Sequence, residues 1–96
     1  VIGAGVSLGN GCIINSGSIL EHGCTVGSFA HTAPGCTLCG NVKIGDNTHI
    51  GAGSTVIQNL TIGSNSMIGA GSLVLSDISS NKLVYGSPTR EVGRFE

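Results

Sequence analysis

The stretch VIGAGVSLGNGCIINSGS, residues 1–18, decides the fold of this chain. Gly3 and Gly5 form a G-x-G pair after two apolar residues, as in a dinucleotide-binding turn. Such a turn must open a helix, but glycines recur at positions 9, 11 and 17, and each one costs a helix about 1 kcal/mol. The letters IGAG of residues 2–5 also return within IGAGS at residues 50–54 and 68–72. The motif is therefore one unit of an internal repeat.

The repeat has a period of six residues and runs without insertion from residue 1 to residue 78. The second position of each hexad is Ile, Leu or Val except at Thr32, and the fifth is Gly, Asn or Asp except at Phe29. The sixth position is small or aliphatic. Because Gly and Asn enter positive φ at low cost, they predict a corner after each short strand, with positions two and six inside. This pattern predicts an all-β fold: a parallel β-helix with three sides, 18 residues per coil and about four coils.

Composition limits the possible functions of a single domain of 96 residues. The net charge of −1 and the 3% aromatic content argue against nucleic-acid binding. No apolar run approaches the roughly 20 residues of a membrane span. We interpret the four cysteines as reduced, mostly internal thiols of a cytoplasmic protein. Because the chain lacks an initiator methionine and begins in repeat phase at Val1, we expect it to be a fragment of a longer protein.

The hexads, with the tail YGSPTR at residues 85–90, resemble the hexapeptide-repeat acyltransferases, whose β-helices are left-handed and assemble as trimers. The tail is similar to their closing segment, so we divide the chain into a β-helix over residues 1–78 and a closing segment over residues 79–96. The predicted outward residues also favour a homotrimer. One wall is polar, whereas the other two present outward aliphatic side chains that neighbours would cover: Ile13, Ile19, Ile57, Met67, Leu73 and Leu75.

The segment EHGCTVGSFAHTAPG, residues 21–35, departs most from the repeat. Phe29 replaces a corner glycine and Thr32 replaces an aliphatic core residue. Such departures cluster at functional sites, and His22 and His31 lie in this segment. His22, at an outer corner, is either a solvated residue or a general base, and Gly40 one coil later leaves room beside its imidazole. We interpret His49, one coil after His31, as a residue that packs at an interface between subunits and has no catalytic role.

The same segment is similar to the sugar-acetylating branch of the family, which includes sialic acid O-acetyltransferases and N-acetyltransferases of nucleotide-linked 4-amino sugars. The resemblance implies that His22 is the catalytic base and that acetyl-CoA contacts the matching His31, Gly40, Ala52 and Ala70. The family often has an acidic residue after the base, where this chain has Gly23. Glu21, the only adjacent carboxylate, is therefore the candidate to assist the base. The branch also has a separate N-terminal domain for the sugar nucleotide, which this chain does not encode.

The tail carries Lys82, Arg90 and Arg94, which could meet the cofactor phosphates or lie free in solvent. Since His22 and His31 are nine residues apart, they fall on different sides of the triangle, and we expect a site shared between two subunits. We predict an acetyl-CoA-dependent acetyltransferase acting on an amino or hydroxyl group of a sugar. A serine or other small-acceptor acetyltransferase and a non-catalytic structural β-helix remain as alternatives. A metal site is not expected, because the histidine spacings do not match the metal-dependent enzymes with this fold.

Overall fold

The computed structural model describes residues 1–94 as a three-walled β-helix closed by a hairpin. Twelve strands of two residues each start at the first position of successive hexads, and two longer strands follow. The strands are β1 Ser7–Leu8, β2 Ile13–Ile14, β3 Ile19–Leu20, β4 Thr25–Val26, β5 His31–Thr32, β6 Thr37–Leu38, β7 Lys43–Ile44, β8 His49–Ile50, β9 Thr55–Val56, β10 Thr61–Ile62, β11 Met67–Ile68, β12 Leu73–Val74, β13 Lys82–Gly86 and β14 Thr89–Arg94.

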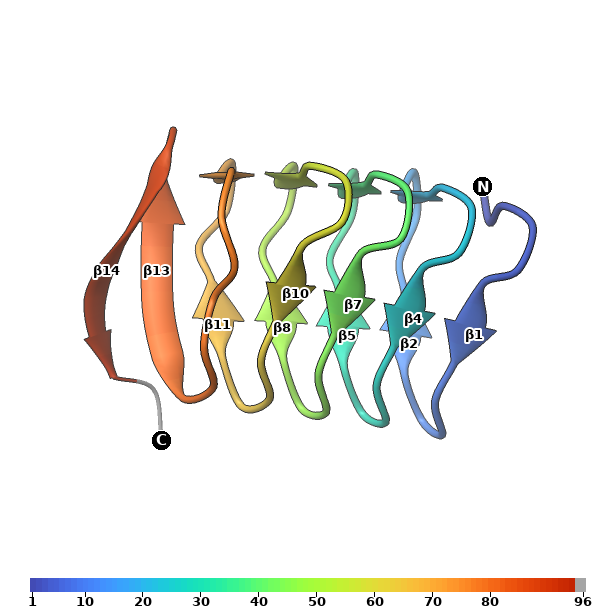
Figure 1. The fold of residues 1–96 in the computed structure, drawn as a ribbon, viewed down its shortest axis with the longest axis horizontal. Helices are drawn as coiled ribbons and strands as arrows, with labels where there is room; N and C mark the ends of the chain where they lie inside the picture. The colour runs from blue at the N-terminus through green and yellow to red at the C-terminus, as the bar shows by residue number, and fades with distance from the viewer. Residues whose placement is uncertain (95–96) are drawn as a thin grey trace.

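The strands form three sheets, one for each wall of the prism, and all pairs are parallel except β13 with β14. We call β1-β4-β7-β10 the polar wall, β2-β5-β8-β11-β13-β14 the histidine wall, and β3-β6-β9-β12 the third wall. Residues 18 apart are in register, as in the pair Ser7 and Thr25. The chain descends the near wall in β1, β4, β7 and β10, ascends behind it in β2, β5 and β8, and moves away from the N-terminus with every coil (Figure 1). The winding is therefore left-handed, and the predicted fold class is confirmed.

The corners lie where the fifth position of the hexad predicts them. From Gly5 to Gly71 every fifth position has positive φ. Glycine and asparagine occupy all of these positions except one, where Phe29 has a φ of 59°. A left-handed backbone costs an ordinary side chain roughly 1–2 kcal/mol, so Phe29 is an exception with a measurable cost.

The core follows positions two and six. The buried aliphatic residues of position two form three columns, represented by Leu20, Val26 and Ile50. Position six is small or aliphatic and often polar, and at several of these positions the hydroxyl or thiol donates to the carbonyl oxygen 15 residues later. These pairs are Ser18 to Ala33, Cys24 to Cys39, Cys36 to Gly51, Thr48 to Gly63 and Ser54 to Gly69. Buried backbone carbonyls need such partners, which explains the composition of this column.

Thr32 is the departure inside the core. Its side chain is fully buried at a position that is otherwise aliphatic, and its Oγ1 has no hydrogen-bond partner within residues 1–94. An unpaired buried hydroxyl costs about 1–3 kcal/mol. The second coil, residues 19–36, therefore contains both this unpaired group and the unusual Phe29 corner.

The outward residues differ between the walls. Ser7, Thr25, Lys43 and Thr61 on the polar wall are all exposed. On the other two walls Ile13, Ile19 and Leu75 are exposed, and Ile57, Met67 and Leu73 are partly exposed. The predicted contrast between one polar and two aliphatic walls is therefore present.

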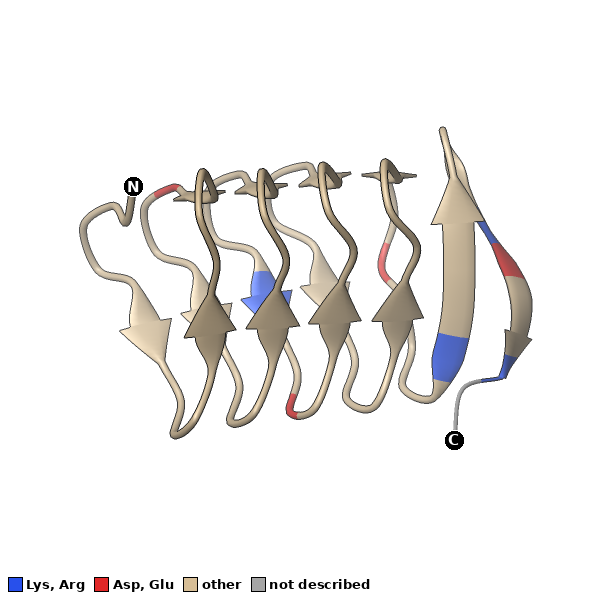
Figure 2. Cartoon of the chain, turned by 180° about the vertical axis from the view of Figure 1, so that it is seen from behind, with Lys and Arg blue, Asp and Glu red and all other residues tan. Residues whose placement is uncertain are grey.

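The C-terminal end closes with the antiparallel hairpin β13–β14. β13 first joins the histidine wall beside β11, with Met67 paired to Leu83, an offset of 16 residues instead of 18. The charged residues Lys82, Arg90, Glu91 and Arg94 belong to this hairpin, whereas the walls carry few charges (Figure 2). No helix among the described residues is long and apolar enough to cross a membrane.

Candidate active site

His22 lies at the corner between β3 and β4, exposed to solvent. Its imidazole packs over Gly40, one coil further along: a Cβ added to Gly40 would lie 2.8 Å from Cε1 and 2.9 Å from Nε2 of His22. Contacts this short are not tolerated between real atoms, so only glycine at position 40 permits this ring position. The backbone N–H of Asn41 donates to the His22 carbonyl at 2.9 Å and ties the two corners together.

Gly23 and Asn41 complete the His22 corner. Gly23 has a φ of 72°, and the amide oxygen of Asn41 occupies the space that a Cβ at position 23 would take. Glu21 is exposed, and within the described part of the chain it makes no hydrogen bond to His22. Its charge acts on the thiol of Cys39, whose pKa is raised by burial first and by Glu21 second.

His31 lies on the histidine wall in a small polar cluster. Its ring meets His49 edge to face, with centroids 4.7 Å apart and an interplanar angle of 80°. The Nδ2 of Asn15 lies 3.3 Å from Nε2 of His31. Because an amide nitrogen can only donate, Nε2 of His31 is the acceptor in this contact. Burial, and secondly the neighbouring His31, lowers the pKa of His49.

Asn15 was missed by the sequence analysis. It occupies the third position of its hexad, in a column that continues with Ala33, Gly51 and Gly69. A single polar side chain at the head of a column of small residues was the available signal. Its offset of 16 residues from His31 breaks the expected 18-residue register, so spacing alone did not pair the two residues.

The structure does not bring His22 and His31 together within one chain. The His22 corner joins the third wall to the polar wall, whereas His31 belongs to the histidine wall. In a triangular section this corner lies opposite the histidine wall. The two histidines therefore lie on separate faces of the chain.

Pro34, Ala52 and Ala70 form an exposed column at the corner between the histidine wall and the third wall. Backbone hydrogen bonds link this column, with Gly53 donating to Pro34 and Gly71 to Ala52. The column leads toward the hairpin, where the N–H of Gly86 donates to the hydroxyl of Ser72. In that hairpin Arg90 pairs across from Tyr85, and both residues are exposed.

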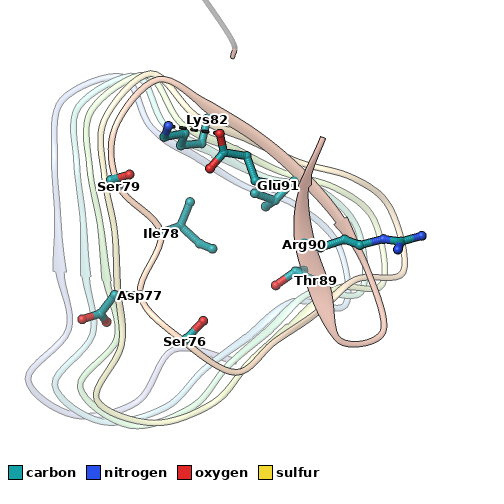
Figure 3. Close-up of a pocket in the computed structure, with 9 residues that line it drawn as sticks. Ser76, Asp77, Ile78, Ser79, Lys82, Thr89, Arg90 and Glu91 are labelled. Carbon is teal, nitrogen blue, oxygen red and sulfur yellow. Dashed lines mark hydrogen bonds and ion pairs between the residues drawn. The ribbon is translucent and has the colours of Figure 1, made fainter. Parts of the chain in front are cut away.

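A cavity of about 190 Å³ lies between the last coil and the hairpin. Figure 3 shows Ser76, Asp77, Ile78 and Ser79 on one side, and Thr89 and Glu91 on the other. Lys82 Nζ and Glu91 Oε1 form an ion pair of 3.1 Å at its edge, while Arg90 extends away from it (Figure 3). Neither His22 nor His31 lines this cavity, so it is separate from the candidate active site.

The buried cysteines do not have the properties of nucleophiles. Cys24 and Cys36 are fully buried and donate to the carbonyls of Cys39 and Gly51. Burial is the main cause that raises the pKa of both thiols, which disfavours the reactive thiolate. Within residues 1–94, no three His, Cys, Asp or Glu side chains are grouped so that they could hold a metal ion.

The left-handed prism built from six-residue repeats defines a hexapeptide-repeat protein. The family model described as bacterial transferase hexapeptide (six repeats) matches residues 23–58 and 41–76, and the hexapeptide repeat of succinyl-transferase matches residues 1–22. The chain belongs to the bacterial hexapeptide-repeat transferases. A comparison with curated protein sequences finds no significant match.

Solved structures show close similarity over nearly the whole chain. A mutant GDP-perosamine N-acetyltransferase from Caulobacter crescentus, in complex with CoA and GDP-perosamine, is 34% identical with a TM-score of 0.95, over 96% of this chain and 44% of that chain. Serine acetyltransferase from Neisseria gonorrhoeae is 33% identical with a TM-score of 0.87, over 96% and 39%. The acetyltransferase domain of PglB from Neisseria gonorrhoeae is 25% identical with a TM-score of 0.84, over 96% and 54%. This chain thus spans about half the length of these proteins or less.

Proposed function

We propose that this protein transfers the acetyl group of acetyl-CoA to an amino or hydroxyl group of a sugar, with His22 as the general base. The observation that carries the proposal is the packing of the His22 ring on Gly40 at an exposed corner. A glycine that makes room for one imidazole is expected where the position of that ring matters. The similarity to a sugar N-acetyltransferase bound to CoA and its sugar nucleotide supports the choice of acceptor and cosubstrate.

The chemistry needs one proton acceptor and one oxyanion stabiliser. The acceptor nitrogen or oxygen attacks the thioester carbonyl carbon while His22 takes its proton. The new C–N or C–O bond forms, the C–S bond breaks, and the thiolate of CoA receives the proton from His22. The backbone N–H of Gly40 has no acceptor among the described residues, so it is available to stabilise the oxyanion, an effect worth a few kcal/mol.

The cofactor would follow the exposed corner column of Pro34, Ala52 and Ala70, which we call the small-residue column. Pro34, Ala52 and Ala70 leave room for an extended pantetheine arm along the corner, and Arg90 in the hairpin supplies a cation for the phosphates. His31 would face the same arm. Because acetyl-CoA is a metabolite of the cytoplasm and the thiols are free, we infer a cytoplasmic location.

A complete site requires a second copy of the chain, because His22 and His31 lie on separate walls. We infer a homotrimer in which His22 of one subunit faces His31 of the next, giving three sites. Mixed trimers of a His22→Ala chain and a His31→Ala chain should regain part of the activity, since some interfaces then keep both histidines. Mixtures that form trimers but stay inactive would contradict the shared site.

The central experiment measures acetyl-CoA consumption with GDP-perosamine, N-acetylneuraminic acid and L-serine as acceptors. His22→Ala should lower kcat by about 10²–10⁴-fold, with the fold unchanged by circular dichroism. Gln58→Ala is the matched control, because Gln58 occupies the same exposed corner position two coils later. A near-normal rate for His22→Ala removes this residue as the base.

The acceptor screen also tests the second candidate function. The serine acetyltransferase structures that match this chain favour L-serine as the second candidate. Turnover of L-serine and of neither sugar would assign the protein to that class. No thioester consumption with any acceptor would instead support a structural β-helix module.

A further inference from the structure

Phe29 is the one residue at a left-handed corner of the β-helix that is neither glycine nor asparagine. Its φ of 59° equals that of Asn41. The same corner of the following coils carries Asn47 and Asn65, with φ of 57° and 56°. A phenyl side chain is disfavoured in this conformation, whereas asparagine tolerates it. The chain therefore has a residue with an unfavourable backbone conformation where the following coils have asparagine, which adopts it more easily.

The contacts of Phe29 within the chain do not compensate this cost. The ring lies over Gly11 in the first coil, where an added Cβ would come 2.6 Å from Cε1, and 66% of the residue remains exposed. The corner itself is held by backbone bonds that any residue would make, such as the N–H of Phe29 donating to Asn10 at 2.8 Å. An exposed aromatic ring that rests on a glycine is suited to bind something outside the chain.

The position of Phe29 indicates which part of the reaction it serves. It precedes His31 by two residues, so it lies at the edge of the histidine wall next to β5. Its ring reaches back to the first coil. The small-residue column occupies the other edge of the same wall and leads forward to the hairpin. Phe29 and the proposed cofactor path are thus on opposite sides of His31.

We propose that Phe29 is the platform on which the sugar ring of the acceptor stacks. The proposal rests on the proposed sugar acetyltransferase function and names one of its binding residues. The C–H face of a pyranose is apolar and weakly electropositive, and it complements the electron-rich face of a phenyl ring. The same contact is useless to an acceptor without a ring, which makes Phe29 a determinant of specificity.

The test compares Phe29→Asn with Phe29→Tyr. Asparagine suits the backbone and removes the ring, so Phe29→Asn should fold at least as stably as the wild type. With GDP-perosamine or N-acetylneuraminic acid as acceptor, its KM for the sugar should rise about tenfold, while the KM for acetyl-CoA stays the same. Phe29→Tyr keeps the ring and should retain the KM of the wild type. Any turnover of L-serine should be equal in both variants.

Two results would overturn the inference: an unchanged sugar KM in Phe29→Asn, or loss of the oligomer in that variant, which would make the ring a subunit contact. A wild-type protein that acetylates neither sugar contradicts the proposed function but does not test the platform.

Saturation-transfer NMR of the same two sugars, which needs no turnover, then decides whether Phe29 binds the sugar ring. Saturation transfer from the protein to the ring protons of the sugar, lost in Phe29→Asn, supports the platform. Transfer that is absent in the wild type, or unaltered in the variant, refutes it.

Discussion

The second coil, residues 19–36, and the fourth coil, residues 55–72, have the same length and the same register but opposite relations to the repeat. The fourth coil places Asn59, Asn65 and Gly71 at its corners and buries only aliphatic residues at its second positions. The second coil places Phe29 at a corner and buries Thr32. One coil thus satisfies the requirements of the fold everywhere, and the other does not.

The difference between the two coils amounts to a few kcal/mol. A left-handed phenylalanine costs roughly 1–2 kcal/mol, and an unpaired buried hydroxyl about 1–3 kcal/mol. Whole domains are stable by only about 5–15 kcal/mol, so these costs are a large share of the total. Proteins keep such costs where binding or catalysis requires the residue, which applies to the exposed Phe29 and not to the fully buried Thr32. The comparison teaches that the residues which depart from the repeat are concentrated in the coil that carries both His22 and His31.

The largest effect that the comparison of the coils predicts comes from Gly40, which lies between His22 of the second coil and Gln58 of the fourth. Gly40→Ala would place a Cβ within 3 Å of the imidazole and force the ring aside. A displacement of about 1 Å at a reacting group costs up to about 10²-fold in rate. We therefore expect kcat for acetyl transfer to fall by about 10–100-fold, measured by CoA release.

Gly93→Ala is the control for this substitution, since a Cβ there meets no atom within 4 Å. Neither glycine has positive φ, so backbone strain does not distinguish the two variants. If Gly40→Ala keeps the rate of Gly93→Ala, the ring position of His22 is unimportant, and the special status of the second coil loses its main support.

A smaller effect is expected when the core of the second coil is made like that of the fourth. Thr32→Val removes the unpaired Oγ1 and should raise the free energy of unfolding by about 1 kcal/mol. For a domain of this size that corresponds to about 4–8 °C in Tm, measured by calorimetry. Activity should not change, because the side chain is fully buried inside the prism.

Thr48→Val should have the opposite sign. The hydroxyl of Thr48 donates to the carbonyl of Gly63 at 2.6 Å and accepts from the N–H of Ser66 at 3.2 Å. Its loss leaves both groups unpaired and lowers the stability. Equal destabilisation by the two valines would show that Thr32 is hydrogen-bonded after all, and that the second coil is less costly than the fold indicates.

The fold could be predicted almost completely from the sequence, because corners and core positions are local requirements that repeat every six residues. Even the exceptions Phe29 and Thr32 stood out against the fourth coil by type alone. The left-handed winding was different: the period does not determine it, and it was expected only from the family resemblance. The shortened last coil, with its offset of 16 residues, also has no signal in the hexads.

The candidate site was predictable in part for the same physical reason. The 18-residue register gives columns, so Gly40 beside His22 and His49 beside His31 followed from counting. The side-chain contacts between different columns could not be predicted from this register. Asn15 reaches His31 over 16 residues, and Asn41 fills the space above Gly23; both depend on rotamers and not on register.

The smallest predicted effect concerns the column of His31, His49 and Met67, which runs from the second coil through the third to the fourth. Burial is the main cause that lowers the pKa of His49 below its ordinary value of 6.5, and the neighbouring His31 is the second cause. The unfolded chain therefore binds a proton more readily than the folded one as the pH falls below 6.5, and the free energy of unfolding must decrease in that range. His49→Met gives the third coil the residue of the fourth and removes this contribution. Urea titrations at pH 7.5 and pH 5.5 should show a smaller loss of stability for His49→Met than for the wild type. An unchanged loss would mean that His49 is as accessible to protons in the folded chain as in the unfolded one, so that the contact between the two histidines does not couple the second coil to the third.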